Sequence, residues 1–153
     1  MTNRFGVMEI QPYKSFEPLC LGESTRDDCV TAFGKPLQNR TNSEGIEEFH
    51  YPHFILRFDR EKRVLQECTL IPRASATIDD IEITWDYAFL RQACSRDGLP
   101  RDMHGFIVLA DLGIAVTGIH DNDDSQLAIT VFSEGAFDDL LKESVPFDRS
   151  MLD

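Results

Sequence analysis

The chain has 153 residues, with 42% hydrophobic and 27% charged side chains and a formal net charge of −12. This length suits one domain, or two small units that share a core. Residues 77–153 hold sixteen of the 27 acidic side chains but only five of the 15 basic ones. That balance argues against nucleic-acid binding, which needs a basic face, and favours a basic protein partner. The alternative is that the acids only keep the protein soluble.

The sequence also predicts where the protein acts. No apolar run approaches the roughly 20 residues of a membrane helix, and the N-terminus shows no apolar signal core before Glu9. We therefore expect a cytoplasmic protein that does not bind membranes. The cysteines form no CxxC pair and no zinc-ligand spacing, so we expect free and mostly buried thiols. They are Cys20, Cys29, Cys68 and Cys94.

The first part of the chain predicts a short strand and one well-marked helix. Residues 6–10 are apolar enough for the strand. Ser24 or Thr25 can cap a helix that begins directly after them, and acidic residues follow where the helix dipole favours negative charge. Gly34 and Pro36 then end the helix, because glycine adopts the terminating conformation and proline prevents continuation.

Strands are predicted after this helix. Residues 38–45 are polar and read as a turn or loop. Residues 47–51 predict one strand and residues 54–58 a stronger one, in which phenylalanine and leucine alternate with other residues. After a charged turn, residues 63–71 return as the partner strand of a hairpin. Residues 72–77 read as a linker between two halves.

The second half repeats this order in a weaker form. Thr84 can cap a second helix, in which Trp85 and Phe89 lie four residues apart and face the core. A glycine, one residue and a proline at 98–100 end this helix, as the same pattern at 34–36 ends the first. The remaining elements expected are strands at 78–83, 106–110, 114–119 and 127–132, and a terminal helix at 137–142.

These elements predict the fold class. We expect an α+β fold in which residues 1–153 form a single domain built of two helix-plus-β-hairpin repeats, at about 6–72 and 77–142. Neither repeat would bury much apolar surface alone. Their strands are therefore expected to form one antiparallel sheet, with the helices on one face. The opposite face would be open to solvent or to a partner.

Several short motifs resemble the repeat of the beta-lactamase-inhibitor-protein-like superfamily, whose relatives include the SmpA/OmlA outer-membrane assembly lipoproteins. The resemblance covers residues 20–71 closely and 84–132 loosely. Its motifs are Leu21-Gly22-x-Ser24, Gly34-Lys35-Pro36, Leu56-Arg57-Phe58-Asp59 and Val64-Leu65. It implies the tandem-repeat fold. The chain departs from the lipoproteins because it shows no lipobox, so we do not expect their envelope role.

A second resemblance concerns function. The tandem arrangement and the opening Ile10-Gln11-Pro12-x-Lys14-Ser15-Phe16 are similar to small cytosolic bacterial proteins of the immunity type, which are associated with toxin neutralisation. This resemblance implies a non-enzymatic inhibitor that binds a cognate toxin or effector and occludes its active site. The alternatives are an adaptor or assembly module and a small hydrolase or transferase.

Candidate partner-binding residues come from the aromatic and acidic clusters. Phe49, Tyr51 and His53 alternate on a predicted strand, so one sheet face would display aromatics, unless these residues pack beneath a helix. Tyr87 would point away from the core side of its helix. Carboxylates in a turn could meet lysine or arginine residues of a basic partner. The residues proposed for partner binding are Tyr51, His53, Tyr87, Asp121, Asp123 and Asp124.

Motifs for chemistry are weak. His50 and His53 lie three apart without further ligands at a telling spacing. The acidic segment that begins at Asp121 has Gln126 where a calcium loop needs glycine and Phe132 where it needs glutamate. No phosphate-binding loop, dinucleotide fingerprint or nucleophile motif occurs. We therefore expect no catalytic residues, no metal site and no cofactor, and the protein is predicted not to be an enzyme.

Overall fold

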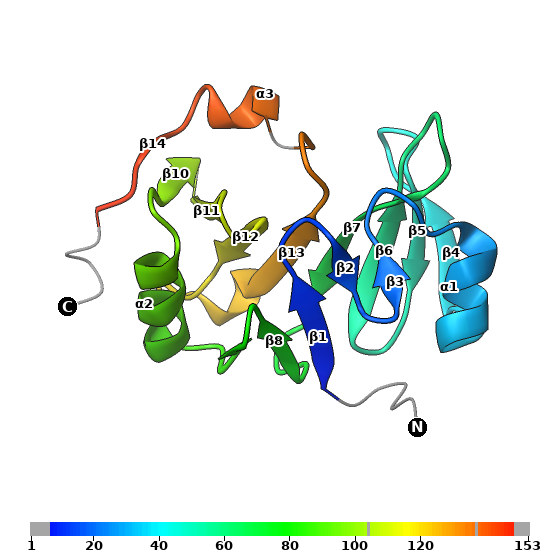
Figure 1. Cartoon of the computed structure of the whole chain (residues 1–153), viewed down its shortest axis with the longest axis horizontal. Coiled ribbons are helices and arrows are strands. Elements are labelled where there is room, and N and C mark those ends of the chain that lie inside the picture. Colours follow the sequence, from blue (N-terminus) through cyan, green and yellow to red (C-terminus); the bar gives the residue numbers. More distant parts are fainter. Residues whose placement is uncertain (1–6, 104, 137, 149–153) are drawn as a thin grey trace.

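The structure is a computed structural model that describes residues 7–103, 105–136 and 138–148 (Figure 1). It is mostly β, with one sheet of five strands, one of nine, and short helices. The predicted fold class is therefore wrong: the chain is not a balanced α+β domain of two helix-plus-hairpin repeats in one antiparallel sheet. A second sheet, which the sequence did not predict, accounts for most of the difference.

The five-stranded sheet joins segments from both halves of the chain. Its strands, in the order β3-β2-β1-β8-β9, are β1 (Met8–Gln11), β2 (Ser15–Phe16), β3 (Leu19–Cys20), β8 (Ala76–Ile78) and β9 (Ile81–Glu82). β1 and β8 pair in parallel, with Met8 opposite Ala76 and Ile10 opposite Ile78. Part of the predicted linker at 72–77 is therefore a strand of this sheet.

The nine-stranded sheet has the order β14-β10-β11-β12-β13-β7-β6-β5-β4, and its neighbouring strands are antiparallel. The two halves of the chain meet where β7 pairs with β13, with Thr69 opposite Thr130. Its strands are β4 (Gln38–Thr41), β5 (Glu47–His50), β6 (Phe54–Phe58), β7 (Leu65–Leu70), β10 (Arg101–Met103), β11 (Phe106–Leu109), β12 (Ile114–Thr117), β13 (Ala128–Phe132) and β14 (Val145–Pro146).

The first predicted helix is confirmed as α1 (Arg26–Phe33). Thr25 is its N-cap and forms a capping box with Asp28, in which each side chain accepts a hydrogen bond from the backbone of the other. Gly34 ends the helix at φ +84°, a conformation that glycine adopts without steric penalty. Local signals at both ends were therefore sufficient to define this element.

The second helix begins later than predicted. In α2 (Tyr87–Arg96) the N-cap is Asp86, whose side chain accepts a hydrogen bond from the Phe89 backbone. Thr84 is not the cap, and Trp85 precedes the helix instead of lying on its buried face. Phe89 is fully buried, as predicted. The remaining helices of the described residues are the short α3 (Asp138–Leu141), which falls within the terminal helix predicted at 137–142, and the 3₁₀ turn η1 (Asp124–Gln126); residue 137 lies outside the described residues.

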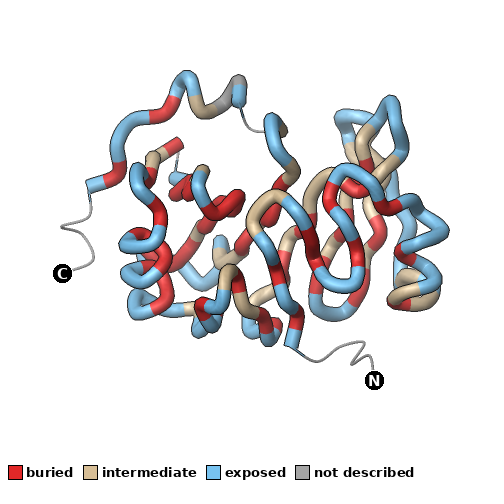
Figure 2. Tube along the Cα trace, in the orientation of Figure 1, coloured by how far each residue is buried: buried red, intermediate tan, exposed pale blue. Residues whose placement is uncertain are grey.

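The main core contains buried residues from both halves of the chain. In Figure 1 the strands β1, β2 and β8 lie in front of the nine-stranded sheet, with α1 and α2 toward its two ends. Figure 2 shows buried stretches on these strands and on the sheet behind them. Phe54 of β6 packs with Phe16 of β2 and Phe33 of α1, with ring centroids 5.2 and 4.8 Å away. These edge-on contacts join the two sheets to the first helix.

A smaller core lies on the opposite face of the nine-stranded sheet. Val108 and Ala115 are paired across β11 and β12 and form this cluster with Met103 and Phe132. The C-terminal segment covers them through residues that include Leu141. No helix among the described residues is long and apolar enough to cross a membrane.

Candidate functional site

The acidic turn, residues 118–124, follows β12, includes the first residue of η1 and carries three of the predicted partner-binding residues. Gly118 begins the turn at φ +86°, and its carbonyl accepts a hydrogen bond from the Asp123 backbone at 2.9 Å. Asp123 also accepts hydrogen bonds from the Ser125 backbone and hydroxyl, at 3.1 and 2.6 Å. These bonds define the backbone of the turn. Asp121, Asp123 and Asp124 are all exposed on it.

The N-terminus of α2 lies against this turn. The Tyr87 hydroxyl donates a hydrogen bond to the His120 carbonyl at 3.2 Å, and 38% of Tyr87 remains exposed. Hydrogen bonds from the Thr84 hydroxyl and the Phe89 backbone lower the pKa of the exposed Asp86 beside it. The structure therefore brings Tyr87 and the acidic turn together, although they are far apart in sequence. We call Tyr87, Asp121, Asp123 and Asp124 the acidic surface.

A groove of about 680 Å³ lies next to the acidic surface. Trp85 and Leu127 line it together with Asp124, and residues of β8 and β9 form another part of the wall. A smaller hollow of about 140 Å³ shares these three residues and is also lined by Asp86 and Tyr87. The groove and the acidic surface are therefore continuous through Asp124.

Trp85 is held in an uncommon conformation in this groove. Its φ is +60°, which is a genuine outlier for a bulky side chain. The indole nitrogen donates a hydrogen bond to the Ala74 carbonyl at 3.0 Å, and the residue is half-buried. Its polar atom is thus already paired, so the surface that Trp85 offers to the groove is aromatic.

His120 supports the acidic turn from inside. Its ring packs edge-on against Phe147, with centroids 6.0 Å apart, and the residue is 9% exposed. Within the described part of the chain, its Nδ1 atom is buried without a hydrogen-bond partner. This packing places the His120 ring next to the C-terminal segment, while its carbonyl accepts the hydrogen bond from Tyr87.

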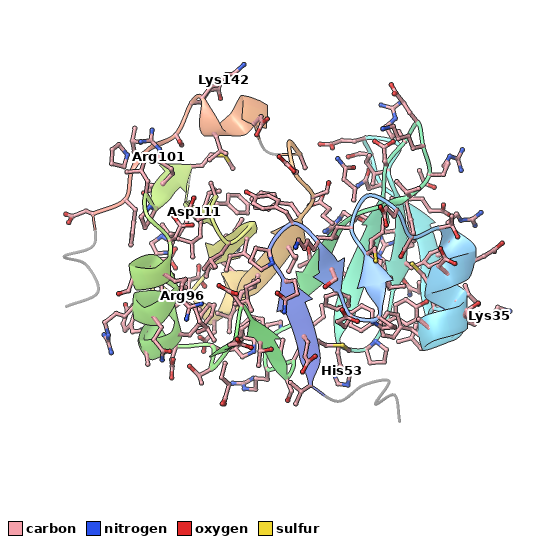
Figure 3. All side chains as sticks on the ribbon, in the orientation of Figure 1. Lys35, His53, Arg96, Arg101, Asp111 and Lys142 are labelled. Carbon is pink, nitrogen blue, oxygen red and sulfur yellow. The ribbon has the colours of Figure 1, made fainter. Side chains whose placement is uncertain are left out.

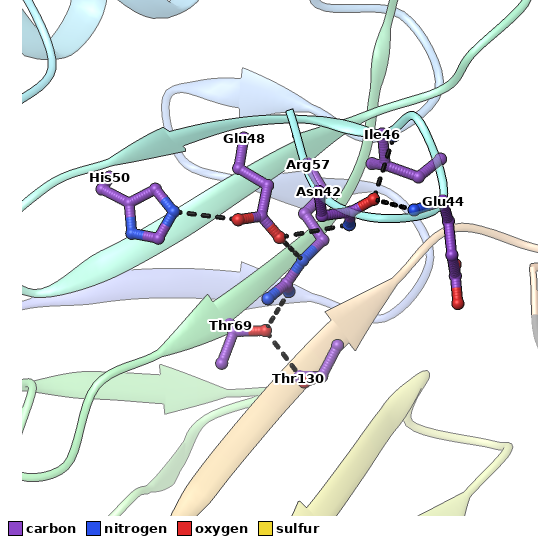
Figure 4. A network of polar contacts seen from close by, with 8 residues as sticks. All are labelled: Asn42, Glu44, Ile46, Glu48, His50, Arg57, Thr69 and Thr130. Carbon is purple, nitrogen blue, oxygen red and sulfur yellow. Dashed lines mark hydrogen bonds and ion pairs between the residues drawn. The ribbon is translucent and has the colours of Figure 1, made fainter. Parts of the chain in front are cut away.

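A second polar cluster lies on the face of the nine-stranded sheet opposite the main core (Figure 4). Glu48 accepts hydrogen bonds from Arg57 Nε and Asn42 Nδ2 and contacts His50 Nε2, at 2.9, 3.4 and 2.9 Å. Arg57 also donates to the Thr69 hydroxyl, which is 3.0 Å from that of Thr130. The network therefore spans four neighbouring strands, from β5 to β13, and ties the two halves of the sheet together.

Two carboxyl groups on this face have opposite pKa shifts. Burial opposes ionisation of Glu48, but hydrogen bonds from His50 and Arg57 outweigh it and lower its pKa. Burial raises the pKa of Glu67, with Arg57 acting against this effect and Glu44 adding to it. The difference arises because Glu48 receives a direct hydrogen bond from the Arg57 guanidinium group and another from His50, whereas burial dominates at Glu67.

The other two predicted residues lie in the first half. Tyr51 is 5% exposed, donates a hydrogen bond to the Gly34 carbonyl at 2.8 Å and packs edge-on against Phe33 of α1. The face that carries Phe49 and Tyr51 is thus covered by α1. His53 is exposed, on the far side of β1 from α2 in Figure 3. The structure therefore does not bring Tyr51 or His53 to the acidic surface.

Sequence reasoning missed Trp85 as a groove residue. The available signal was Asp86, which is at least as good an N-cap as Thr84 and lies three residues before Phe89. Choosing Asp86 would have placed Trp85 outside the helix.

Among the described residues, no group of three or more histidine, cysteine or acidic side chains could hold a metal ion.

Comparisons with known proteins add no relative: no family model, no curated protein and no solved structure matches the chain.

Proposed function

We propose that the protein is a non-enzymatic inhibitor of the immunity type, which acts in the cytoplasm. It binds a basic toxin or effector protein through the acidic surface and occludes the active site of that partner. The observation that carries the proposal is the joining of Tyr87 to the acidic turn, which places an exposed aromatic residue beside a turn that carries three exposed carboxylates.

Charge and chemistry support this proposal in different ways. Aromatic residues are enriched at protein interfaces, and complementary charge accelerates association with a partner of opposite sign. The acidic half of the chain would steer a basic partner toward this surface. The cytoplasmic assignment is supported by Cys20, Cys29, Cys68 and Cys94, which are all free thiols, as expected in a reducing compartment.

The test is to capture a partner from the native cell with the purified protein, identify it, and measure its activity as the protein is added. We expect inhibition that is complete at an equimolar ratio. An identified partner that retains full activity at saturation would contradict the inhibitor role, and so would turnover of a small molecule without any stoichiometric partner.

A charge variant tests whether the acidic surface is used. Replacing Asp121, Asp123 and Asp124 with asparagine should slow association with the identified partner by about tenfold and weaken its salt dependence, because electrostatic steering is lost. Asp123 is the N-cap of η1, a role that asparagine also fills. The control replaces the exposed Glu17, Glu23 and Glu143 with glutamine, which changes net charge equally elsewhere. Equal rates for both variants would exclude this surface.

A further inference from the structure

The groove beside the acidic surface has the size of a binding site. Its volume of about 680 Å³ lies within the range of 300–1,000 Å³ that is typical of ligand pockets. It is lined by residues 73–77 and 82–85 together with Asp124 and Leu127. Val7 also lines it, so an occupant would contact four separate parts of the chain at once.

The charges that line the groove favour a cationic occupant. Glu82 and Asp124 are both exposed and line it, and Arg73 is the basic residue among its described lining residues. Asp86 lines the adjoining hollow and adds a further negative charge. An anionic group would meet more like charge than opposite charge here, whereas a cation would be attracted.

The aromatic surface of Trp85 indicates which kind of cation the groove would bind. Tryptophan is the aromatic side chain that best attracts a cation to its face, and a guanidinium group also stacks on it through its plane. Leu127 offers apolar contact for an aliphatic stem in the same groove. An arginine side chain has both parts, a flat cationic head and an apolar stem.

We propose that this groove binds an arginine side chain presented by the basic protein partner, stacked on Trp85 and paired with Glu82 and Asp124. The proposal rests on the proposed function, since it names the side chain by which that partner is recognised. It extends the contact from the exposed acidic surface into a defined pocket, where a desolvated anchor contributes more to binding than rim charges do.

The test uses Trp85 as its own reporter, because it is the single tryptophan of the chain. The probe is the peptide acetyl-Gly-Gly-Arg-Gly-Gly-amide, titrated into the full-length protein while tryptophan emission is recorded. We expect a saturable change in emission. The matched peptide with citrulline, which is nearly isosteric with arginine but neutral, should give no saturable change.

Variants of the protein test whether the arginine peptide binds in the groove. Glu82→Gln combined with Asp124→Asn should raise the dissociation constant of the arginine peptide at least fivefold, whereas Glu143→Gln should leave it unchanged. Circular dichroism checks that each variant is folded. The inference is overturned if the citrulline peptide gives the same curve, if the arginine peptide gives none, or if the Glu82 and Asp124 variant binds like the wild type.

The two proposals fail in different ways. If the captured partner is inhibited but the arginine peptide does not bind, the groove inference is wrong and the inhibitor function stands. If the arginine peptide binds as expected but no partner is inhibited, the groove is a cation site and the inhibitor function is wrong.

Discussion

The Tyr87 hydroxyl donates a hydrogen bond to the His120 carbonyl across 33 residues of sequence, and this bond joins the first turn of α2 to the acidic turn. Tyr87→Phe removes the bond and keeps the ring. We expect the free energy of unfolding to fall by about 0.5–1.5 kcal/mol, measured by urea denaturation. Amide exchange at Asn122 and Asp123 should become faster, because the turn loses an anchor.

Tyr51→Phe is the matched control for this prediction. It removes a tyrosine hydrogen bond to a backbone carbonyl, from Tyr51 to Gly34 at 2.8 Å, on the other half of the molecule. Its loss of stability should be at least as large, because Tyr51 is buried, but exchange in the acidic turn should not change. Faster exchange at Asn122 in both variants would show that the change is global, and the anchoring role of Tyr87 would then be wrong.

Gly118 is the second determinant of the acidic turn. A Cβ atom at this position would lie 2.6 Å from the backbone nitrogen and Cα of Leu127, and the φ of +86° is itself unfavourable for other residues. Gly118→Ala should therefore destabilise the protein by more than about 2 kcal/mol in thermal or urea unfolding, since the backbone must shift.

Gly22→Ala separates the steric effect of the close approach to Leu127 from the conformational effect of a positive φ. Gly22 has a φ of +82°, but a Cβ atom there would have no atom of the described structure within 4 Å. This variant should lose only about 1 kcal/mol, which is the conformational part of the effect. Equal losses at the two glycines would mean that the close approach to Leu127 contributes nothing.

The helix α1 and the five-stranded sheet show which parts of the fold the sequence could and could not predict. The helix α1 was predictable because Thr25 and Gly34 lie next to the residues they cap, so the information is local. The five-stranded sheet was not predictable, because β2, β3 and β9 have two residues each, which is too short to show an alternation of apolar and polar residues. Its parallel pairing of β1 with β8 also joins segments that are far apart in the sequence.

The candidate site was predictable only in part. The acidic turn and Tyr87 were identified from charge and helix position, but their contact depends on tertiary structure. The predicted alternation of Phe49, Tyr51 and His53 is right only in part, because Phe49 and Tyr51 are buried whereas His53 is exposed. The pattern within one strand does not say which face a helix covers, and α1 packs on the face of Tyr51 through Phe33.

Glu48 predicts a pH dependence of stability. Its pKa is lowered in the folded state, so its ionised form stabilises the fold above its unfolded pKa, and this contribution is lost as pH falls through the folded value. Glu48→Gln should lower the free energy of unfolding by about 1–3 kcal/mol near neutral pH, because Arg57 and His50 lose a charged acceptor. Urea denaturation between pH 3 and 7 should show this difference shrink in acid. A constant difference would contradict the pKa assignment.

Glu67 should behave in the opposite way on the same sheet face. Burial raises its pKa in the folded state, so the protonated form is favoured there and ionisation works against folding. The destabilisation appears as pH rises above the unfolded pKa and is absent in acid. Glu67→Gln, which stays neutral, should therefore be more stable than the wild type near neutral pH and equal to it at about pH 3. Urea denaturation of both proteins across this range measures the gain. A variant that is less stable than the wild type at neutral pH would show that the Glu67 carboxylate is stabilised by Arg57 more than it is destabilised by burial.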